Sequence, residues 1–374
     1  MAPGPTPVPP DVLLEMAKPI FHHRTKRFRD IVAEANQNLK RVLLTSNPVL
    51  TLTSSGTGAM EASVVNMLSP GDKVITINGG KFGERFGLIA KAYGIQVLEI
   101  MVTWGEAVDS SKVEALLKAN SDVKAVFATL CETSTGVKHD IKSLASVVGK
   151  TNAILVVDAI SGLTADELKT DDWGVDIAIA GSQKALMLPP GLAFLSISEK
   201  AKALMEKSTC PKFYFNLKKA LKSYEADDTP WTPALTLIIG LNSVLKMILD
   251  EGMDNVLKRH ARHAEAIRAG VQALGLKLYA PSAPSNTVTS VKIPDSVDGL
   301  AFVKKIRDEK GVTFAGGQDD AKGKIFRASL LGYACDFDVV VAMSAIEMVM
   351  HELGYKFEIG TGVKKAQQSL LEVR

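Results

Sequence analysis

The sequence predicts an α/β protein in which a largely parallel sheet is covered by helices on both faces and is followed by a smaller α+β domain. Short apolar, β-branched stretches recur between residues 74 and 197, and segments with helical periodicity separate most of them. This alternation is typical of parallel sheets, whose strands are joined by crossover helices. After Ser198 the pattern changes to a lysine-rich segment, a breaker-rich loop and long helical stretches.

The individual elements follow from these patterns in chain order. Five prolines within the first ten residues favour an extended N-terminal arm. We expect strands at 74–78, 96–102, 124–130, 153–157, 176–180 and 192–197, and helices at 57–68, 83–93, 110–118 and 141–148. A long helical stretch follows from about Pro233 to Leu274, and its second half carries a basic face that we interpret as solvated: Lys258, Arg259, Arg262 and His263. Strands at 286–293 and 324–330 then alternate with helices at 297–309 and 336–353.

Composition excludes several classes of protein. The formal net charge is only +3, which argues against binding to a nucleic-acid backbone as the main function. No apolar run approaches the roughly 20 residues of a membrane span, and the N-terminus does not resemble a signal peptide. The three cysteines are widely spaced and odd in number, so they indicate neither a disulfide framework nor a zinc site. We therefore expect a cytoplasmic protein without a metal or a membrane partner.

The first candidate site is the run from Thr53 to Glu61, which follows an apolar strand and opens a helix. It contains Ser55, Gly56, Thr57 and Gly58. Small residues let a ligand approach the backbone, and a helix N-terminus offers free N–H groups to a phosphate. Ser and Thr are also ordinary helix N-caps, so this motif alone leaves a structural role open.

Two further candidates end buried strands. Asp158 follows the apolar run from Ile154 to Val157, at the sheet edge where α/β proteins bind ligands. Lys184 follows another apolar strand, and burial there would favour the neutral, nucleophilic amine. A helix cap for Asp158 and a surface-reaching lysine remain the alternatives. A phosphate-binding turn, a strand-end acid and a strand-end lysine together are what pyridoxal phosphate requires.

At this point the chain resembles a class V aminotransferase of fold type I, nearest to the alanine–glyoxylate and serine–pyruvate aminotransferase group. The resemblance runs almost from end to end, and its most specific part is Gly181-Ser182-Gln183-Lys184 followed by Pro189-Pro190-Gly191. The other matching segments are Pro3 to Pro9, His23-Arg24, Ser55 to Gly58, Asn78-Gly79, Phe82 to Arg85, Glu132 to Gly136, Asp158 and Phe326 to Ser329.

The resemblance implies a fold and a domain organisation. The fold would be a large domain with a mostly parallel seven-stranded sheet between helices, plus a small C-terminal α+β domain. The large domain would span residues 16–250 and the small domain 251–374, with residues 1–15 forming an arm that joins the small domain. The resemblance also implies a homodimer with shared active sites.

Roles for individual residues follow from the same resemblance. Lys184 would form the Schiff base with pyridoxal 5'-phosphate, and Asp158 would bind its ring nitrogen. Phe82 would stack on the ring at a position that is often Trp in this group, and Thr133 or Ser134 would contact the phenolic oxygen. Thr232 lies in a loop that resembles the segment reaching the phosphate from the neighbouring subunit in this family. The remaining phosphate ligands would be Ser55, Gly56, Thr57, Gly58 and Gln183.

Arg327 is the candidate for binding the substrate carboxylate, because a guanidinium can contact a carboxylate at two points. Gly4, in the N-terminal arm, is a second substrate-binding candidate. The expected reaction moves the amino group of alanine, serine or aspartate to glyoxylate or pyruvate. Two alternatives are a pyridoxal-phosphate lyase such as a cysteine desulfurase and a non-catalytic, transaminase-like subunit. Desulfurases typically place His before the lysine and a reactive Cys on a loop, whereas Gln183 precedes Lys184 here and residues 316–318 contain no Cys.

Overall fold

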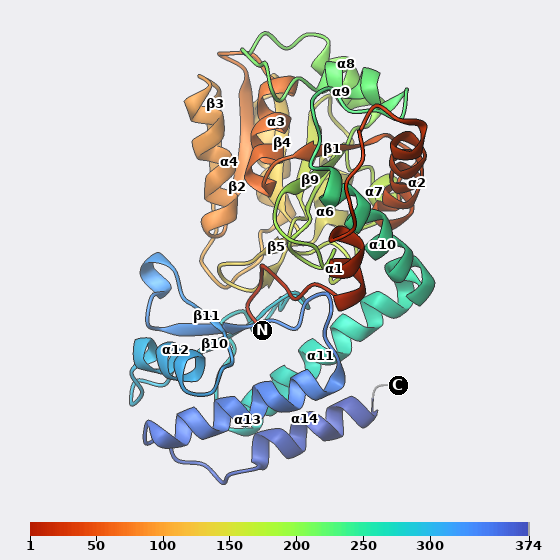
Figure 1. Ribbon diagram of the computed structural model, residues 1–374. Helices are drawn as coiled ribbons and strands as arrows, with labels where there is room; N and C mark the ends of the chain where they lie inside the picture. Colours follow the sequence, from red (N-terminus) through yellow and green to blue (C-terminus); the bar gives the residue numbers. More distant parts are fainter. Residues whose placement is uncertain (373–374) are drawn as a thin grey trace.

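The computed structural model describes residues 1–372, which form a large sheet-based unit above a smaller unit in the view of Figure 1. The large sheet has seven strands in the order β1-β9-β8-β7-β4-β2-β3. Strand β9 is antiparallel to β1 and β8, whereas the other neighbouring strands are parallel, which confirms the predicted sheet. The strands are β1 (Val49–Thr53), β2 (Lys73–Asn78), β3 (Gln96–Met101), β4 (Val123–Thr129), β7 (Ile154–Asp158), β8 (Ile177–Gly181) and β9 (Leu192–Ser196).

Helices cover both faces of this sheet, because the central strands are apolar on both sides. In β7, Leu155 and Val157 pack into one core while Ile154 and Val156 pack into the other. The first core is covered by α2 (Lys26–Leu43), α5 (Ser110–Ala119), α6 (Ile141–Val148) and α10 (Leu235–Glu251). The second is covered by α3 (Gly56–Met67), α4 (Lys81–Ala92), α8 (Glu199–Met205) and α9 (Leu217–Tyr224).

The smaller unit has its own sheet and core. Its antiparallel strands are ordered β10 (Thr289–Lys292), β12 (Ile325–Ala328) and β11 (Ala315–Gly316). The buried side chains of Phe302, Phe326 and Ile346 lie in a core of this unit. Its helices are α11 (Met253–Ala273), α12 (Gly299–Asp308), α13 (Asp336–Glu352) and α14 (Thr361–Glu372). The short elements are α1 (Pro10–Met16), α7 (Thr170–Trp173), the two-stranded pair β5 (Cys131–Glu132) and β6 (Val137–Lys138), and a 3-10 turn at Asp319–Ala321.

The long helical stretch predicted from Pro233 to Leu274 is two helices. Helix α10 ends at Glu251 and α11 begins at Met253, with Gly252 between them at a φ of 84°. That left-handed conformation is open to glycine but strained for other residues, so the chain changes direction there. The prediction missed the break because apolar periodicity continues on both sides of Gly252.

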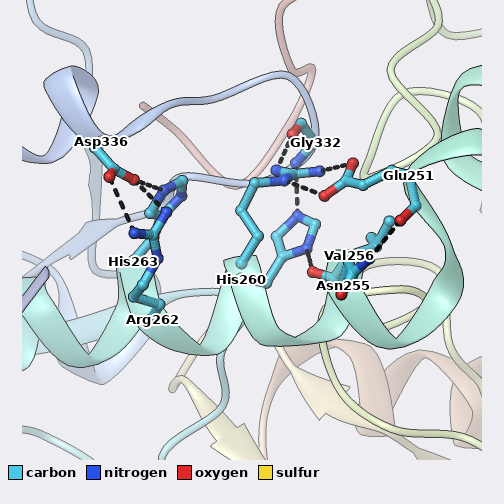
Figure 2. Close-up of polar contacts among 9 residues, drawn as sticks. Glu251, Asn255, Val256, His260, Arg262, His263, Gly332 and Asp336 are labelled. Carbon is cyan, nitrogen blue, oxygen red and sulfur yellow. Dashed lines mark hydrogen bonds and ion pairs between the residues drawn. The ribbon is translucent and has the colours of Figure 1, made fainter. Parts of the chain in front are cut away.

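The basic face of α11 is solvated at Lys258 but not at His263, and Arg259 and Arg262 are only partly exposed, which corrects the prediction for three of the four residues. Figure 2 shows Arg262 and His263 pointing to Asp336 at the start of α13. Arg259 binds Glu251 at the end of α10 and donates to the Gly332 carbonyl. His263 is buried, because α13 and the loop before it cover this face. Arg259, Arg262 and His263 therefore hold the segment around Gly332 and Asp336.

The N-terminal arm runs between the two units and reaches the loop that follows β8. The Met1 carbonyl accepts from the Ser329 backbone N–H at 2.9 Å. The Thr6 hydroxyl donates to the Lys184 carbonyl at 2.7 Å, and its N–H donates to the Gln183 carbonyl at 3.1 Å. The residues before Pro10 form neither helix nor strand, whereas Pro10 itself begins α1.

The domain boundaries after residues 15 and 250 stay a prediction. Within residues 1–372, no helix is long and apolar enough to cross a membrane.

Candidate active site

The carboxyl-terminal ends of several strands surround a cavity of about 110 Å³. The parallel course of β2, β4, β7 and β8 brings the segments that follow them to one edge of the sheet. The cavity is lined by Ser55, Gly56, Thr57, Phe82, Arg85, Thr133, Asp158, Ile160, Ser161, Gln183 and Lys184. Segments far apart in the sequence thus meet at this cavity.

Lys184 lies in the turn after β8. Its amine donates to the Pro3 carbonyl of the N-terminal arm. Burial lowers the pKa of the Lys184 amine, and the nearby Asp158 charge partly opposes this effect. A Cβ atom on Gly4 would lie 2.7 Å from the Lys184 Nζ, so the glycine leaves room for the lysine beside the arm. The lowered pKa shifts the protonation equilibrium of this amine toward its neutral, nucleophilic form.

Asp158 ends β7, and its side chain is only 5% exposed. One carboxylate oxygen accepts from the Ile160 N–H at 2.8 Å. Burial raises the pKa of Asp158 to about 7, while that hydrogen bond and the charges of Arg85 and Lys184 oppose the rise. A buried carboxylate that lines a cavity is suited to bind a cationic N–H group of a ligand.

The N-terminus of α3 forms another wall of the cavity. Helix α3 begins at Gly56 with Ser55 at its N-cap, and the Ser55 side chain makes no capping hydrogen bond within the described residues. The first N–H groups of this 12-residue helix are therefore available to an anion. Gly58 does not line the cavity, because it faces Ser54 and Phe215, where a Cβ atom would lie 1.9 Å from the Ser54 hydroxyl.

Arg85 adds a cation beside this helix terminus, a role that the sequence analysis did not assign to it. Its guanidinium donates to the Thr57 hydroxyl at 3.0 Å and lies 4.8 Å from the centre of the Phe82 ring. Arg85 and Phe82 are three residues apart on α4 and share one face of that helix. This spacing was the available signal for placing Arg85 beside Phe82.

Thr133 and Ser134 differ in what their hydroxyl groups contact. Thr133 lines the cavity, and its hydroxyl lies 2.6 Å from that of Ser161, a cavity residue that the sequence did not single out. Ser134 lies outside the cavity lining. Its hydroxyl donates to Glu132 and accepts from the Lys81 N–H at 3.1 Å. Of the two candidates for the phenolic oxygen, Thr133 is the one with access to the cavity.

Arg327 lies on β12 of the smaller unit and is 6% exposed. It donates to the Thr133 carbonyl at 2.7 Å and twice to the Gly316 carbonyl, at 3.0 and 2.8 Å. Arg327 is absent from the cavity lining, and its bond to Thr133 brings it beside that lining. Burial lowers the pKa of Arg327, and the Glu132 charge opposes that effect.

Thr232 lies apart from the cavity. It is exposed and lines a separate, small hollow with Thr53, Tyr214 and Trp231. The Trp231 indole donates to the Tyr214 carbonyl at 3.1 Å and stacks against Phe213 and Tyr214. Thr232 therefore does not contact the cavity of Lys184 and Asp158 in the same chain.

A family model for class V aminotransferases matches residues 2–341. The chain belongs to this family. The "Soluble hydrogenase, small subunit" of Synechococcus sp. is 40% identical over 99% of this chain and 97% of that protein. The L-aspartate–glyoxylate aminotransferase of Paracoccus denitrificans is 36% identical over 98% of this chain and 94% of that protein. The structure of pyridoxamine-pyruvate aminotransferase from Mesorhizobium loti superimposes with a TM-score of 0.95 at 30% identity, covering 99% and 96% of the two chains.

Family membership confirms the resemblance seen in the sequence, the fold and the dependence on pyridoxal phosphate. The residues of this class V aminotransferase fit that cofactor. The α3 N-terminus can bind a phosphate, and the Asp158 carboxylate can bind a protonated ring nitrogen. The Lys184 amine can form a Schiff base with an aldehyde carbon. Gln183 also lines the cavity, where its side-chain amide nitrogen can donate to a phosphate oxygen.

Proposed function

We propose that this class V aminotransferase moves the amino group of a small amino acid to a small 2-oxo acid. The donor would be alanine, serine or aspartate, and the acceptor glyoxylate or pyruvate. The observation that carries the proposal is the single cavity shared by Lys184, Asp158 and the α3 N-terminus, with Arg327 beside it. The substrates in the names of the relatives from Paracoccus denitrificans and Mesorhizobium loti support the acceptor class.

Each candidate residue has a distinct role in holding the reactants. Ser55, Gly56, Thr57 and Gln183 would bind the cofactor phosphate, with Arg85 as an additional cation. Phe82 would cover one face of the ring, and Thr133 would bind its phenolic oxygen. Gly58 would act indirectly, by allowing the first turn of α3 to pack against Ser54. Arg327 would bind the substrate carboxylate next to the Gly4 segment of the arm.

The proton transfers would be carried out by Lys184. Bound pyridoxal phosphate supplies an electron sink for the charge that develops at the substrate Cα atom. The Lys184 Nζ atom would remove the Cα proton and deliver it to the C4′ atom of the cofactor. Its lowered pKa suits this role, since the base must be neutral when it accepts the proton. The Asp158 carboxylate would keep the proton on the ring nitrogen, which maintains the sink.

A panel of amino donors and 2-oxo acid acceptors tests the proposal directly. We expect pyridoxal-phosphate-dependent formation of the 2-oxo acid from at least one of alanine, serine and aspartate, with glyoxylate or pyruvate as acceptor. The absence of transamination for every pair, by a protein that has taken up the cofactor, would contradict the proposal. Desulfurase activity on cysteine serves as the control for the lyase alternative. A cysteine desulfurase of known structure shares the fold of this chain at only 16% identity.

The hydrogenase-subunit name of the Synechococcus relative bears on the non-catalytic alternative that the sequence left open. Loss of the lysine or of the strand-end acid would be the expected mark of such a subunit, and Lys184 and Asp158 are both present. The visible absorption spectrum separates the two functions. A purified protein that stays colourless when it is supplied with pyridoxal phosphate would favour the structural subunit.

Replacing Arg327 by lysine is expected to lower kcat/KM by roughly 10- to 100-fold. Lysine keeps the charge but loses the two-point contact, and hydrogen bonds to charged groups are worth ~1.5–3 kcal/mol. The affinity for pyridoxal phosphate should hardly change, because Arg327 would contact the substrate. Arg268→Lys is the matched control, since Arg268 is also buried but binds Glu265, Ser285 and Asn286. Wild-type efficiency of Arg327→Lys for every donor would show that the carboxylate is bound elsewhere.

The active unit is expected to be a homodimer with active sites at the subunit interface. Phe213 is 72% exposed and stacks with Trp231 near the Thr229–Pro233 loop, so this loop carries an apolar surface that a second subunit can cover. Sedimentation at assay concentration should give twice the chain mass, and Thr232→Ala should weaken cofactor binding without dissociating the dimer. A fully active monomer would contradict this expectation.

We also propose a cytoplasmic location, because the three cysteines, all within the described residues, are free thiols.

A further inference from the structure

Glu132 is a buried carboxylate beside the cavity for which the proposed reaction has no role. It ends the short strand β5, and its side chain is 0% exposed. One carboxylate oxygen accepts from the backbone N–H groups of Phe82, at 3.1 Å, and Gly83, at 2.9 Å. The other oxygen accepts from the Ser134 N–H at 3.2 Å and from the Ser134 hydroxyl. The contacts on α4 are about 50 residues away in the sequence, so only the tertiary fold creates them.

The hydrogen-bond pattern favours the ionised form of Glu132. The Ser134 hydroxyl accepts from the Lys81 N–H, so its own proton points to Glu132. Three of the four hydrogen bonds come from the backbone N–H groups of Phe82, Gly83 and Ser134, which can only donate, and the fourth comes from the Ser134 hydroxyl, which donates in this arrangement. Burial raises the pKa of Glu132 above its ordinary value, and the four hydrogen bonds oppose this rise only in part.

The Glu132 carboxylate caps the N-terminus of α4, in place of the side chain that the N-cap residue lacks. Helix α4 begins after Gly80, which has no side chain to cap it. The Glu132 carboxylate binds the free N–H groups of the first turn of α4, where a negative charge is favourable. A Cβ atom on Gly80 would lie 2.7 Å from the Glu132 side chain, so the glycine allows the close approach.

The same carboxylate connects two walls of the cavity. Its partner Phe82 supplies one wall, and Thr133, which lies between Glu132 and Ser134, supplies another. The Thr133 carbonyl is also the acceptor for Arg327. A shift of the carboxylate would therefore change the distance between Phe82 and Thr133.

We propose that Glu132 is a positioning residue, whose carboxylate fixes the gap between Phe82 and Thr133 into which the cofactor ring fits. This inference rests on the proposed function, because it assigns the ring to that gap. Glu132 contacts neither substrate nor cofactor directly and acts through the backbone of its neighbours. The competing interpretation is that Glu132 only stabilises α4 as a helix cap.

Glu347 offers a matched control for the helix-cap interpretation. It is also buried, at 3% exposure, and its carboxylate accepts from the backbone N–H groups of Gly360, at 2.6 Å, and Val363, at 2.9 Å. These bonds hold the start of α14 in the smaller unit, and Glu347 does not line the cavity. Glu132→Gln and Glu347→Gln therefore remove the same kind of capping charge from two helices, only one of which carries a cavity residue.

The experiment compares both glutamine variants with the wild-type protein. Thermal unfolding of the cofactor-free proteins measures the structural effect, and we expect both variants to lose stability. Titration with pyridoxal phosphate, followed by visible absorption and circular dichroism, measures the positioning effect. We expect Glu132→Gln to bind the cofactor at least about 10-fold more weakly with a reduced circular dichroism band, and Glu347→Gln to match the wild type. Equal cofactor affinity and equal band intensity in the two variants would overturn the proposal.

Ser134→Ala covers the case in which Glu132→Gln does not fold, because it removes a single donor to the carboxylate. We expect it to weaken cofactor binding several-fold, and an unchanged affinity together with an unchanged dichroism band would overturn the proposal. The wild-type titration separates the two levels of inference. A wild-type protein that binds no pyridoxal phosphate would refute the proposed function itself, whereas normal wild-type binding with an unaffected Glu132→Gln refutes only the positioning role.

Discussion

Lys184→Ala is expected to abolish transamination and the visible absorption of the bound cofactor. The other groups that line the cavity include no second lysine, so no other amine there can form the Schiff base or accept the Cα proton. The measurement is 2-oxo acid production together with a visible spectrum of the variant after incubation with pyridoxal phosphate. We expect activity to fall by at least about three orders of magnitude, to the background of the assay.

A second lysine supplies the control for this variant. Lys212 is also partly buried, and burial likewise lowers its pKa, but it donates to the carbonyls of Val65, Ser208 and Cys210 and lies outside the cavity lining. Lys212→Ala should retain the spectrum and the activity of the wild type. Full activity of Lys184→Ala would remove the basis of the proposed function.

Asp158→Asn is expected to lower kcat by roughly 100-fold or more while retaining part of the cofactor affinity. The loss of one preorganised electrostatic group in an active site costs about this factor. Asparagine is nearly isosteric, but it cannot hold the proton on the ring nitrogen, so the electron sink weakens. Steady-state kinetics at saturating substrate and cofactor measure the effect. Unchanged turnover would assign Asp158 to a structural role at the Ile160 N–H.

The same substitution is expected to stabilise the cofactor-free protein at alkaline pH. Burial raises the pKa of Asp158 from 3.8 to about 7, so the folded state binds this proton more tightly than the unfolded state. The associated stability is present below the unfolded pKa and is lost as the pH rises through about 7. Asp158→Asn has no charge to bury, so its advantage over the wild type should grow between pH 4 and pH 8. Urea unfolding of both cofactor-free proteins at several pH values tests the sign, and a variant that is less stable at pH 8 contradicts it.

Local patterns were sufficient for most of the large sheet. The strand predicted at 153–157 is β7 at Ile154–Asp158, and the helix predicted at 141–148 is α6 with the same bounds. Strands that are buried on both faces are apolar throughout, which makes them visible without knowledge of their neighbours. The break at Gly252 was missed for the corresponding reason, since apolar periodicity does not report a change of direction.

The sequence by itself determined which residues end the strands and open the helices, because these depend on neighbours along the chain. That was enough to single out Asp158, Lys184 and the segment from Ser55, which the fold brings to one cavity. Only the tertiary structure decided which hydroxyl faces the cavity, since Ser134 turns to Glu132 while its neighbour Thr133 does not. It also decided that His263 is buried against α13. Ser134 also accepts from the Lys81 N–H, 53 residues away, and the His263 partner Asp336 is 73 residues away. Such hydrogen bonds exist only once the packing of distant segments excludes water.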